Sequence, residues 1–170
     1  MILGMSTATY TVVHVILSFL GIVSGFVVIF GLIRNRRLDS WTSVFLASTA
    51  LTSISGFGFP FEHLLPSHKV GIVSLLVLAV TIPARYVFHL TGRWRSTYVV
   101  GAAIALYLNV FVFVVQAFLK VPALKALAPT QTEPPFLVAQ LVVLAVFIAL
   151  SVLAVKRFRD KPVQAMARAA

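Results

Sequence analysis

Five long apolar stretches separated by short polar breaks restrict the fold of this chain more than any other feature. The chain has 170 residues, of which 60% are hydrophobic and 11% are charged. A water-soluble core in a chain of this size cannot bury so much apolar surface, so lipid must be the solvent. Because a hydrocarbon layer about 30 Å thick needs roughly 20 apolar residues per helix, the chain has room for about five crossings and little else.

The stretches predict an all-α fold, a polytopic bundle of five transmembrane helices that forms a single domain over residues 1–170. The predicted spans cover about residues 9–33, 41–59, 70–90, 97–119 and 136–155, and residues 156–170 form a short basic tail. We do not expect the first span to be a cleaved signal peptide. Its apolar run is too long, and the positive charge follows it.

The Lys and Arg residues concentrate in every second break, which predicts the orientation of the helices. Eleven of the 14 lie on one side of the predicted membrane, and three lie on the other. Since cytoplasmic loops carry the excess of Lys and Arg, we expect the N-terminus outside and the C-terminus inside. The inner residues are Arg34, Arg36, Arg37, Arg85, Arg93, Arg95, Lys156, Arg157, Arg159, Lys161 and Arg168, and the outer ones are Lys69, Lys120 and Lys125.

The formal net charge of +10 would indicate a nucleic-acid partner in a soluble protein. Here the basic residues stand in small groups at the ends of spans, where they meet anionic lipid headgroups on the cytoplasmic side. We therefore expect membrane lipids and no nucleic acid as partners, and leave a membrane-protein partner or a homo-oligomer open. The chain has no cysteine, which excludes disulfides and thiolate metal sites.

Small residues indicate where helices pack in lipid, because close backbone approach replaces hydrophobic exclusion there. Gly21 and Gly25 form a GxxxG on the first span, on the face of His14 and Ser18, and we expect it to pack helices within the chain. The second span should be the buried centre of the bundle because it is rich in hydroxyls, which can bond to their own helix. These are Thr42, Ser43, Ser48, Thr49, Thr52, Ser53 and Ser55.

Strongly polar side chains inside a membrane are candidate binding residues because their desolvation is costly. The candidates toward the outer face are His14, Gln116 and Gln140, with Asn109 near mid-membrane. Asn109 and Gln116 are seven residues apart and share a helix face with Ala102, which predicts a small and polar stripe that looks into the bundle. We therefore expect a polar ligand pocket in the outer leaflet.

Toward the inner face, Arg85 and His89 are four residues apart on the third span, just after Pro83, which should kink the helix. A guanidinium one turn inside the boundary is suited to a lipid phosphate, a quinone head or another anion. Alternatively, Arg85 extends to the cytoplasmic interface beside Arg93 and Arg95.

The histidines raise two cofactor hypotheses. Haem b needs two axial His at similar depth on different helices. His14 and His89 lie in opposite leaflets and cannot be partners, whereas pairing of His14 with the loop residue His63 or His68 is geometrically possible. Glu62, His63 and His68 together would suit zinc or iron. Neither spacing matches a specific motif, and solvated loop histidines are the alternative.

Catalytic motifs are missing from the sequence, which lacks GxSxG, HExxH, a Walker loop and a glycine-rich dinucleotide fingerprint. We therefore predict no catalytic residue. The four carboxylates lie outside the apolar cores, and this position argues against a proton-coupled pump, which needs acidic groups inside the membrane. The leading hypothesis is a non-catalytic membrane protein, either an accessory subunit of a complex or a binder of a small amphipathic ligand. The alternatives are a haem- or quinone-binding redox protein and a passive channel or facilitator.

Three stretches resemble segments of known proteins. They are TSISGFGFPFEH at 52–63, ARYVFHLTGRWR at 84–95 and NVFVFVVQAFLKVPALKALAPTQTEPPF at 109–136. They are similar to small polytopic inner-membrane proteins of bacteria that have no assigned activity, and the similarity covers most of the chain. The resemblance implies a bacterial inner-membrane location and no particular chemistry.

Overall fold

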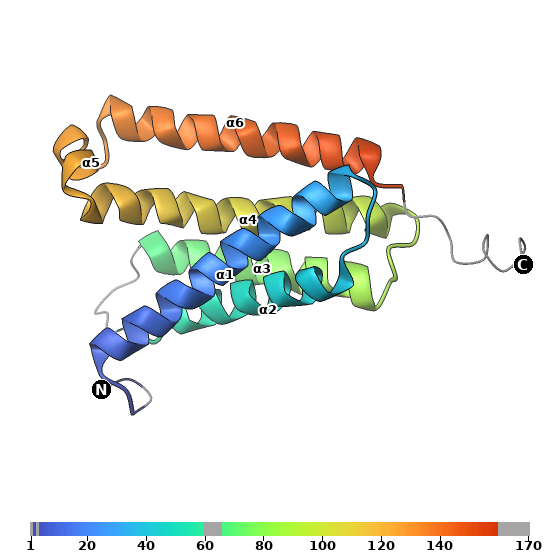
Figure 1. Ribbon diagram of the computed structural model, residues 1–170, viewed down its shortest axis with the longest axis horizontal. Coiled ribbons are helices and arrows are strands. Elements are labelled where there is room, and N and C mark those ends of the chain that lie inside the picture. The colour runs from blue at the N-terminus through green and yellow to red at the C-terminus, as the bar shows by residue number, and fades with distance from the viewer. Residues whose placement is uncertain (1, 3, 60–65, 160–170) are drawn as a thin grey trace, which may run out of the picture.

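The computed structural model is an all-α bundle in which each long helix runs back along the one before it (Figure 1). It describes residue 2 and residues 4–59 and 66–159. The helices are α1 (Thr7–Ile33), α2 (Asp39–Gly56), α3 (Pro66–Tyr86), α4 (Arg93–Lys120), α5 (Pro122–Leu127) and α6 (Pro134–Arg157). The predicted all-α class is confirmed.

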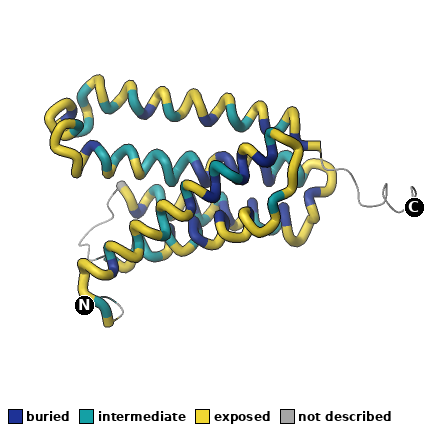
Figure 2. The backbone as a smooth tube through the Cα atoms, in the orientation of Figure 1, coloured by how far each residue is buried: buried dark blue, intermediate teal, exposed yellow. Residues whose placement is uncertain are grey.

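Four of the described helices are long and apolar enough to cross a membrane, namely α1, α4, α6 and Ser67–Tyr86 of α3. They make the chain a multi-pass helical membrane protein, and their outward faces are largely exposed (Figure 2). α2 is less apolar because eight of its 18 residues are Ser or Thr. Of the five crossings predicted from the sequence, four therefore correspond to candidate membrane spans among the described residues.

The ends of the helices follow from local chemistry. The hydroxyl of Ser6 accepts a hydrogen bond from the N–H of Thr9 at 3.1 Å, which caps the start of α1. α4 ends before Val121, whose extended backbone is the conformation favoured ahead of Pro122. α6 begins with Pro134, which has no N–H to leave unpaired in the first turn.

The break between α4 and α6 contains the short helix α5 and a turn organised by Glu133. The Glu133 carboxylate accepts hydrogen bonds from the N–H groups of Thr130 and Thr132 at 3.1 Å and from the Thr130 hydroxyl at 2.9 Å. Desolvation acts to raise the pKa of Glu133, but these hydrogen bonds outweigh it and lower the pKa below its usual value.

The centre of the bundle is α4 and not α2. α4 contacts every other helix, and its N-terminal half carries the fully buried Tyr98 and Leu106. α2 lies between α1 and α3 and exposes Leu51. The expectation of a central second helix is wrong because hydroxyls need no central position: Ser48 and Ser53 donate to carbonyls of their own helix at 2.6 and 2.9 Å.

The two glycines of the GxxxG bring α1 close to α2 and α4. A Cβ on Gly25 would lie 2.6 Å from Cδ1 of Leu106 on α4 and 2.8 Å from Cε2 of Phe45 on α2. A Cβ on Gly21 would lie 3.2 Å from Oγ1 of Thr49 on α2. The prediction that this motif packs helices within the chain is confirmed, since both glycines face helices of the same chain.

α3 ends at Tyr86, short of the predicted end near residue 90. His89 and Leu90 follow with positive φ angles of 48° and 61°, which a right-handed helix does not accommodate. Arg85 and His89 therefore do not share a helix face, and that part of the prediction is wrong. α3 and α4 pack as antiparallel neighbours across this short turn.

Candidate functional site

His14 joins α1 to the end of α2. Its Nδ1 lies 2.8 Å from the hydroxyl of Ser55, and its ring meets Phe59 edge-on with centroids 5.3 Å apart. Tyr10, one turn earlier on α1, donates its hydroxyl to the carbonyl of Ser55 at 2.7 Å. The imidazole thus has a structural partner in the α1–α2 seam, at the end where α1 begins.

Asn109 and Gln140 bond across two different helix seams. Nδ2 of Asn109 on α4 donates to Oγ1 of Thr49 on α2 at 3.0 Å. Nε2 of Gln140 on α6 donates to the carbonyl of Phe111 on α4 at 3.3 Å, and the Gln140 side-chain oxygen is buried without a hydrogen-bond partner among the described residues. The structure therefore does not bring these amides and His14 into one pocket.

Gln116 is exposed, so the predicted inward stripe on α4 ends halfway along the helix. Ala102 and Ala105 are fully buried, whereas no residue from 107 to 117 is buried. Two causes explain why the stripe ends. Residues seven apart are offset by about 20° around a helix. In addition, α1 diverges from α4 toward the end where α5 lies (Figure 1). Sequence spacing alone did not reveal this divergence.

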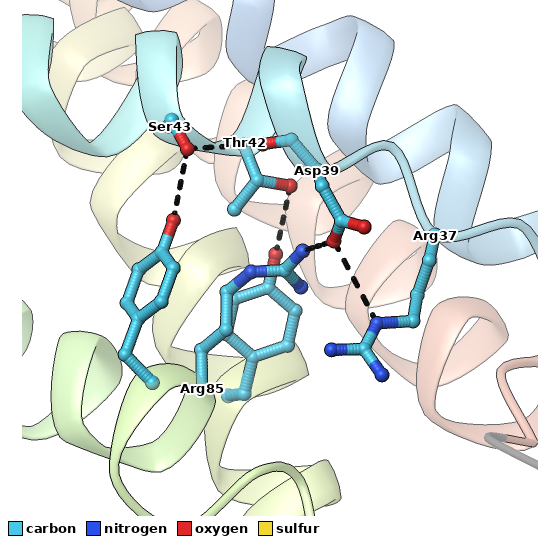
Figure 3. A network of polar contacts seen from close by, with 7 residues as sticks. Arg37, Asp39, Thr42, Ser43 and Arg85 are labelled. Carbon is cyan, nitrogen blue, oxygen red and sulfur yellow. Dashed lines mark hydrogen bonds and ion pairs between the residues drawn. The ribbon is translucent and has the colours of Figure 1, made fainter. Parts of the chain in front are cut away.

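Arg85 is the centre of a polar network at the end of the bundle where α2 begins and α3 ends (Figure 3). Its side chain is only 3% exposed, and it forms an ion pair with Asp39 at the start of α2. The guanidinium carbon also lies 5.6 Å from the ring centroid of Tyr86 and 5.2 Å from that of Tyr98. Arg37 approaches the same carboxylate oxygen at 3.7 Å.

Hydroxyls from α2 hold both tyrosines of this network. Ser43 lies 3.1 Å from the Tyr86 hydroxyl, and Thr42 lies 3.4 Å from the Tyr98 hydroxyl. The network therefore ties α2, α3 and α4 together, and Arg85 is buried rather than exposed beside Arg93 and Arg95. The sequence signal for its partner was Asp39, one of the four carboxylates outside the apolar cores.

The remaining histidine candidates are dispersed. His89 is exposed in the turn after α3, and His68 on α3 is buried and stacks on Phe57 with centroids 5.5 Å apart. Glu62 and His63 lie outside the described residues. In the described ranges, no three His, Asp or Glu side chains gather into a metal-binding group. The metal set of Glu62, His63 and His68 and the haem ligand pairs stay predictions.

A groove of about 500 Å³ lies along the C-terminal half of α1 and was not anticipated from the sequence. Val23 and Phe30 are 56% and 48% exposed, so it opens outward, and Phe26 packs on Phe147 of α6 with centroids 5.9 Å apart. The groove is apolar along α1 and cationic just after the C-terminal end of that helix. Its lining residues are Val23, Phe26, Val27, Phe30, Gly31, Arg34, Arg36 and Leu38.

The spacing of Val23, Val27, Phe30 and Arg34, in steps of four, three and four, was the signal that could have revealed this groove, because such residues share a helix face. A second cavity, of about 190 Å³, lies between α4 and α6.

Comparison of the chain with protein families, with curated proteins and with solved structures finds no match. The assignment as a small polytopic membrane protein thus depends on its four apolar helices.

Proposed function

We propose that this protein is a non-catalytic membrane protein that binds an amphipathic ligand in the groove along the inner half of α1. The single observation that carries the proposal is the lining of that groove, which is apolar from Val23 to Phe30 and ends in Arg34 and Arg36. Its volume of about 500 Å³ is in the range of small-molecule sites. An amphipathic molecule matches such a lining because its tail and head need different surroundings.

The outer-leaflet pocket expected from the sequence has less support. His14, Asn109 and Gln140 each bond to a different neighbour, and Gln116 is exposed. A side chain that already bonds across a helix seam must give up that bond to hold a ligand. The groove needs no such exchange, and we therefore place ligand binding at the inner end of α1.

The groove is tested by filling it. Val23→Trp is expected to lower the phospholipid that stays bound through purification in mild detergent about tenfold, or about 1.4 kcal/mol, because the indole occupies the apolar channel. Val23 is 56% exposed, so the larger side chain has room outside the packed core. Native mass spectrometry of the purified protein measures the bound lipid.

The matched control is Ile16→Trp, which adds the same indole to α1 at a position that is 60% exposed and outside the groove. It is expected to retain lipid like the unmodified protein. Equal retention by Val23→Trp and the unmodified protein would refute ligand binding at this site.

The same proposal includes five crossings with the N-terminus outside and the C-terminus inside. Support comes from α2, which packs between α1 and α3 and whose 18 residues extend about 27 Å. Its lower apolar character is tolerable because its hydroxyls bond to its own carbonyls. Arg34, Arg93 and Arg157 flank helix ends at one end of the bundle, which is expected to be cytoplasmic.

Reporter fusions test this topology. Green fluorescent protein at the C-terminus is expected to fluoresce, and alkaline phosphatase at the N-terminus is expected to be active, since five crossings put the ends on opposite sides. Activity patterns that put both ends in one compartment would contradict five crossings and favour four. The resemblance to bacterial proteins and the basic inner end support the inner membrane of a bacterium as the location.

A further inference from the structure

We infer that the groove ligand is an anionic phospholipid of the cytoplasmic leaflet, with its phosphate at Arg34 and Arg36 and an acyl chain along α1. This inference rests on the proposed function and specifies its ligand. The two guanidinium groups line the same groove as Val23, Val27 and Phe30. Guanidinium groups bind phosphate oxygens with paired, charge-assisted hydrogen bonds. A head with net negative charge is favoured over phosphatidylcholine, whose choline ammonium offsets the charge of its phosphate and is repelled by the two arginines.

Arg34 and Arg36 have no carboxylate partner among the described residues. The two described carboxylates are Asp39, which pairs with Arg85 and Arg37, and Glu133, which lies at the opposite end of the bundle beside α6. The whole chain has four Asp and Glu against 14 Lys and Arg. Positive charge at this end therefore needs anions from outside the chain.

The end of α1 does not supply acceptors for these guanidinium groups. The carbonyl of Phe30 accepts the N–H of Arg34 at 3.1 Å, and that of Gly31 accepts the N–H groups of Arg34 and Arg36 at 3.0 and 2.9 Å. The carbonyl of Leu32 accepts the N–H of Asn35 at 3.0 Å. Neither guanidinium group bonds to a described residue, so the two arginine side chains are available to an external anion.

The groove has the dimensions of a lipid contact. From Phe30 to Val23 the helix rises about 10 Å away from the arginines, the length of about eight methylene groups. The apolar part therefore enters the hydrocarbon layer while the arginines stay at headgroup level. Phe26 and Phe147 form an aromatic wall beside α6 that an acyl chain can contact.

The segment that carries both arginines is fixed at two points. Asn35, with a φ of 56°, accepts the N–H of Arg159 through its Oδ1 at 2.7 Å, which joins the segment to the end of α6. Asp39, which ends the segment, forms the ion pair with Arg85. A segment held at two points loses little backbone freedom on binding, which favours affinity.

The test measures headgroup preference in nanodiscs that contain equal amounts of phosphatidylglycerol and phosphatidylcholine. Native mass spectrometry of the ejected protein is expected to show about a tenfold preference for phosphatidylglycerol. Arg34→Gln with Arg36→Gln should reduce that preference to about equal binding, because the acyl contacts persist without the charges. The matched control, Arg93→Gln with Arg157→Gln, removes two exposed charges at the same end and should keep the preference.

The outcomes separate this inference from the proposed function. Equal binding of both lipids by the unmodified protein, with loss of both in Val23→Trp, would overturn the anionic headgroup and leave the groove as a binding site. A preference that the control pair abolishes as well would also overturn it, since any two charges would then suffice. No retained lipid, or a dimer without lipid, would overturn the inference and the proposed function together.

Discussion

Gly25→Ala is expected to destabilise the bundle by about 1–3 kcal/mol, although alanine favours a helix over glycine by about 1 kcal/mol. The added Cβ would lie 2.6 Å from Leu106 and 2.8 Å from Phe45, and both side chains are 0% exposed. Neither neighbour has free space to move into, so α1 must separate from α2 and α4. Denaturant unfolding in detergent micelles measures the change in free energy.

Two further glycines make this prediction a graded series. At Gly21 the nearest atom to an added Cβ is 3.2 Å away, and at Gly56 it is Cε1 of His14 at 3.9 Å, an ordinary contact. Stability is expected to fall in the order Gly56→Ala, Gly21→Ala, Gly25→Ala, with Gly56→Ala close to the unmodified protein. Equal stability of all three variants would mean that α1 does not pack in this register.

Asp39→Asn is expected to lower the free energy of unfolding by about 1–3 kcal/mol, because it leaves the Arg85 guanidinium buried without a carboxylate. We expect a smaller loss of stability than for a fully buried ion pair, because the Asp39 side chain is 72% exposed although that of Arg85 is only 3% exposed. The rings of Tyr86 and Tyr98 remain beside the charge and retain part of its stabilisation. The same unfolding titration measures the loss.

Arg37→Gln is the control, because Arg37 touches the same carboxylate from a more exposed position at 3.7 Å and should contribute less than about 1 kcal/mol. Combining Asp39→Asn with Arg85→Met should recover stability relative to Asp39→Asn alone, since the buried charge is then absent. If Asp39→Asn lowers the free energy of unfolding no more than Arg37→Gln does, the ion pair with Asp39 does not stabilise the buried Arg85, and Tyr86 and Tyr98 do so alone.

Local features of the sequence predicted much of the architecture. Each of the five apolar stretches contains a long helix, and the GxxxG of the first stretch packs within the chain, because both depend on residues close together in the sequence. The predicted third span failed at its end. Positive φ angles at His89 and Leu90, which the residue types do not announce, stop the helix at Tyr86.

The candidate sites were harder to predict, because a polar side chain in a membrane bonds to whichever helix lies across from it. Helical spacing placed Asn109 and Gln116 on one face, but only the crossing of α4 with α2 gives Asn109 the hydroxyl of Thr49 and leaves Gln116 exposed. Arg85 and Asp39 are 46 residues apart, and no spacing rule joins them.

By itself, the sequence determined that this chain is a set of long helices in lipid with its positive charge at one end, because hydrocarbon requires each segment to satisfy its own backbone. The tertiary structure alone decided that α4 is central, that Asp39 neutralises Arg85 and that Arg34 and Arg36 border an apolar groove. These depend on the tilt and rotation of helices against each other, which are set by contacts between residues far apart in the chain.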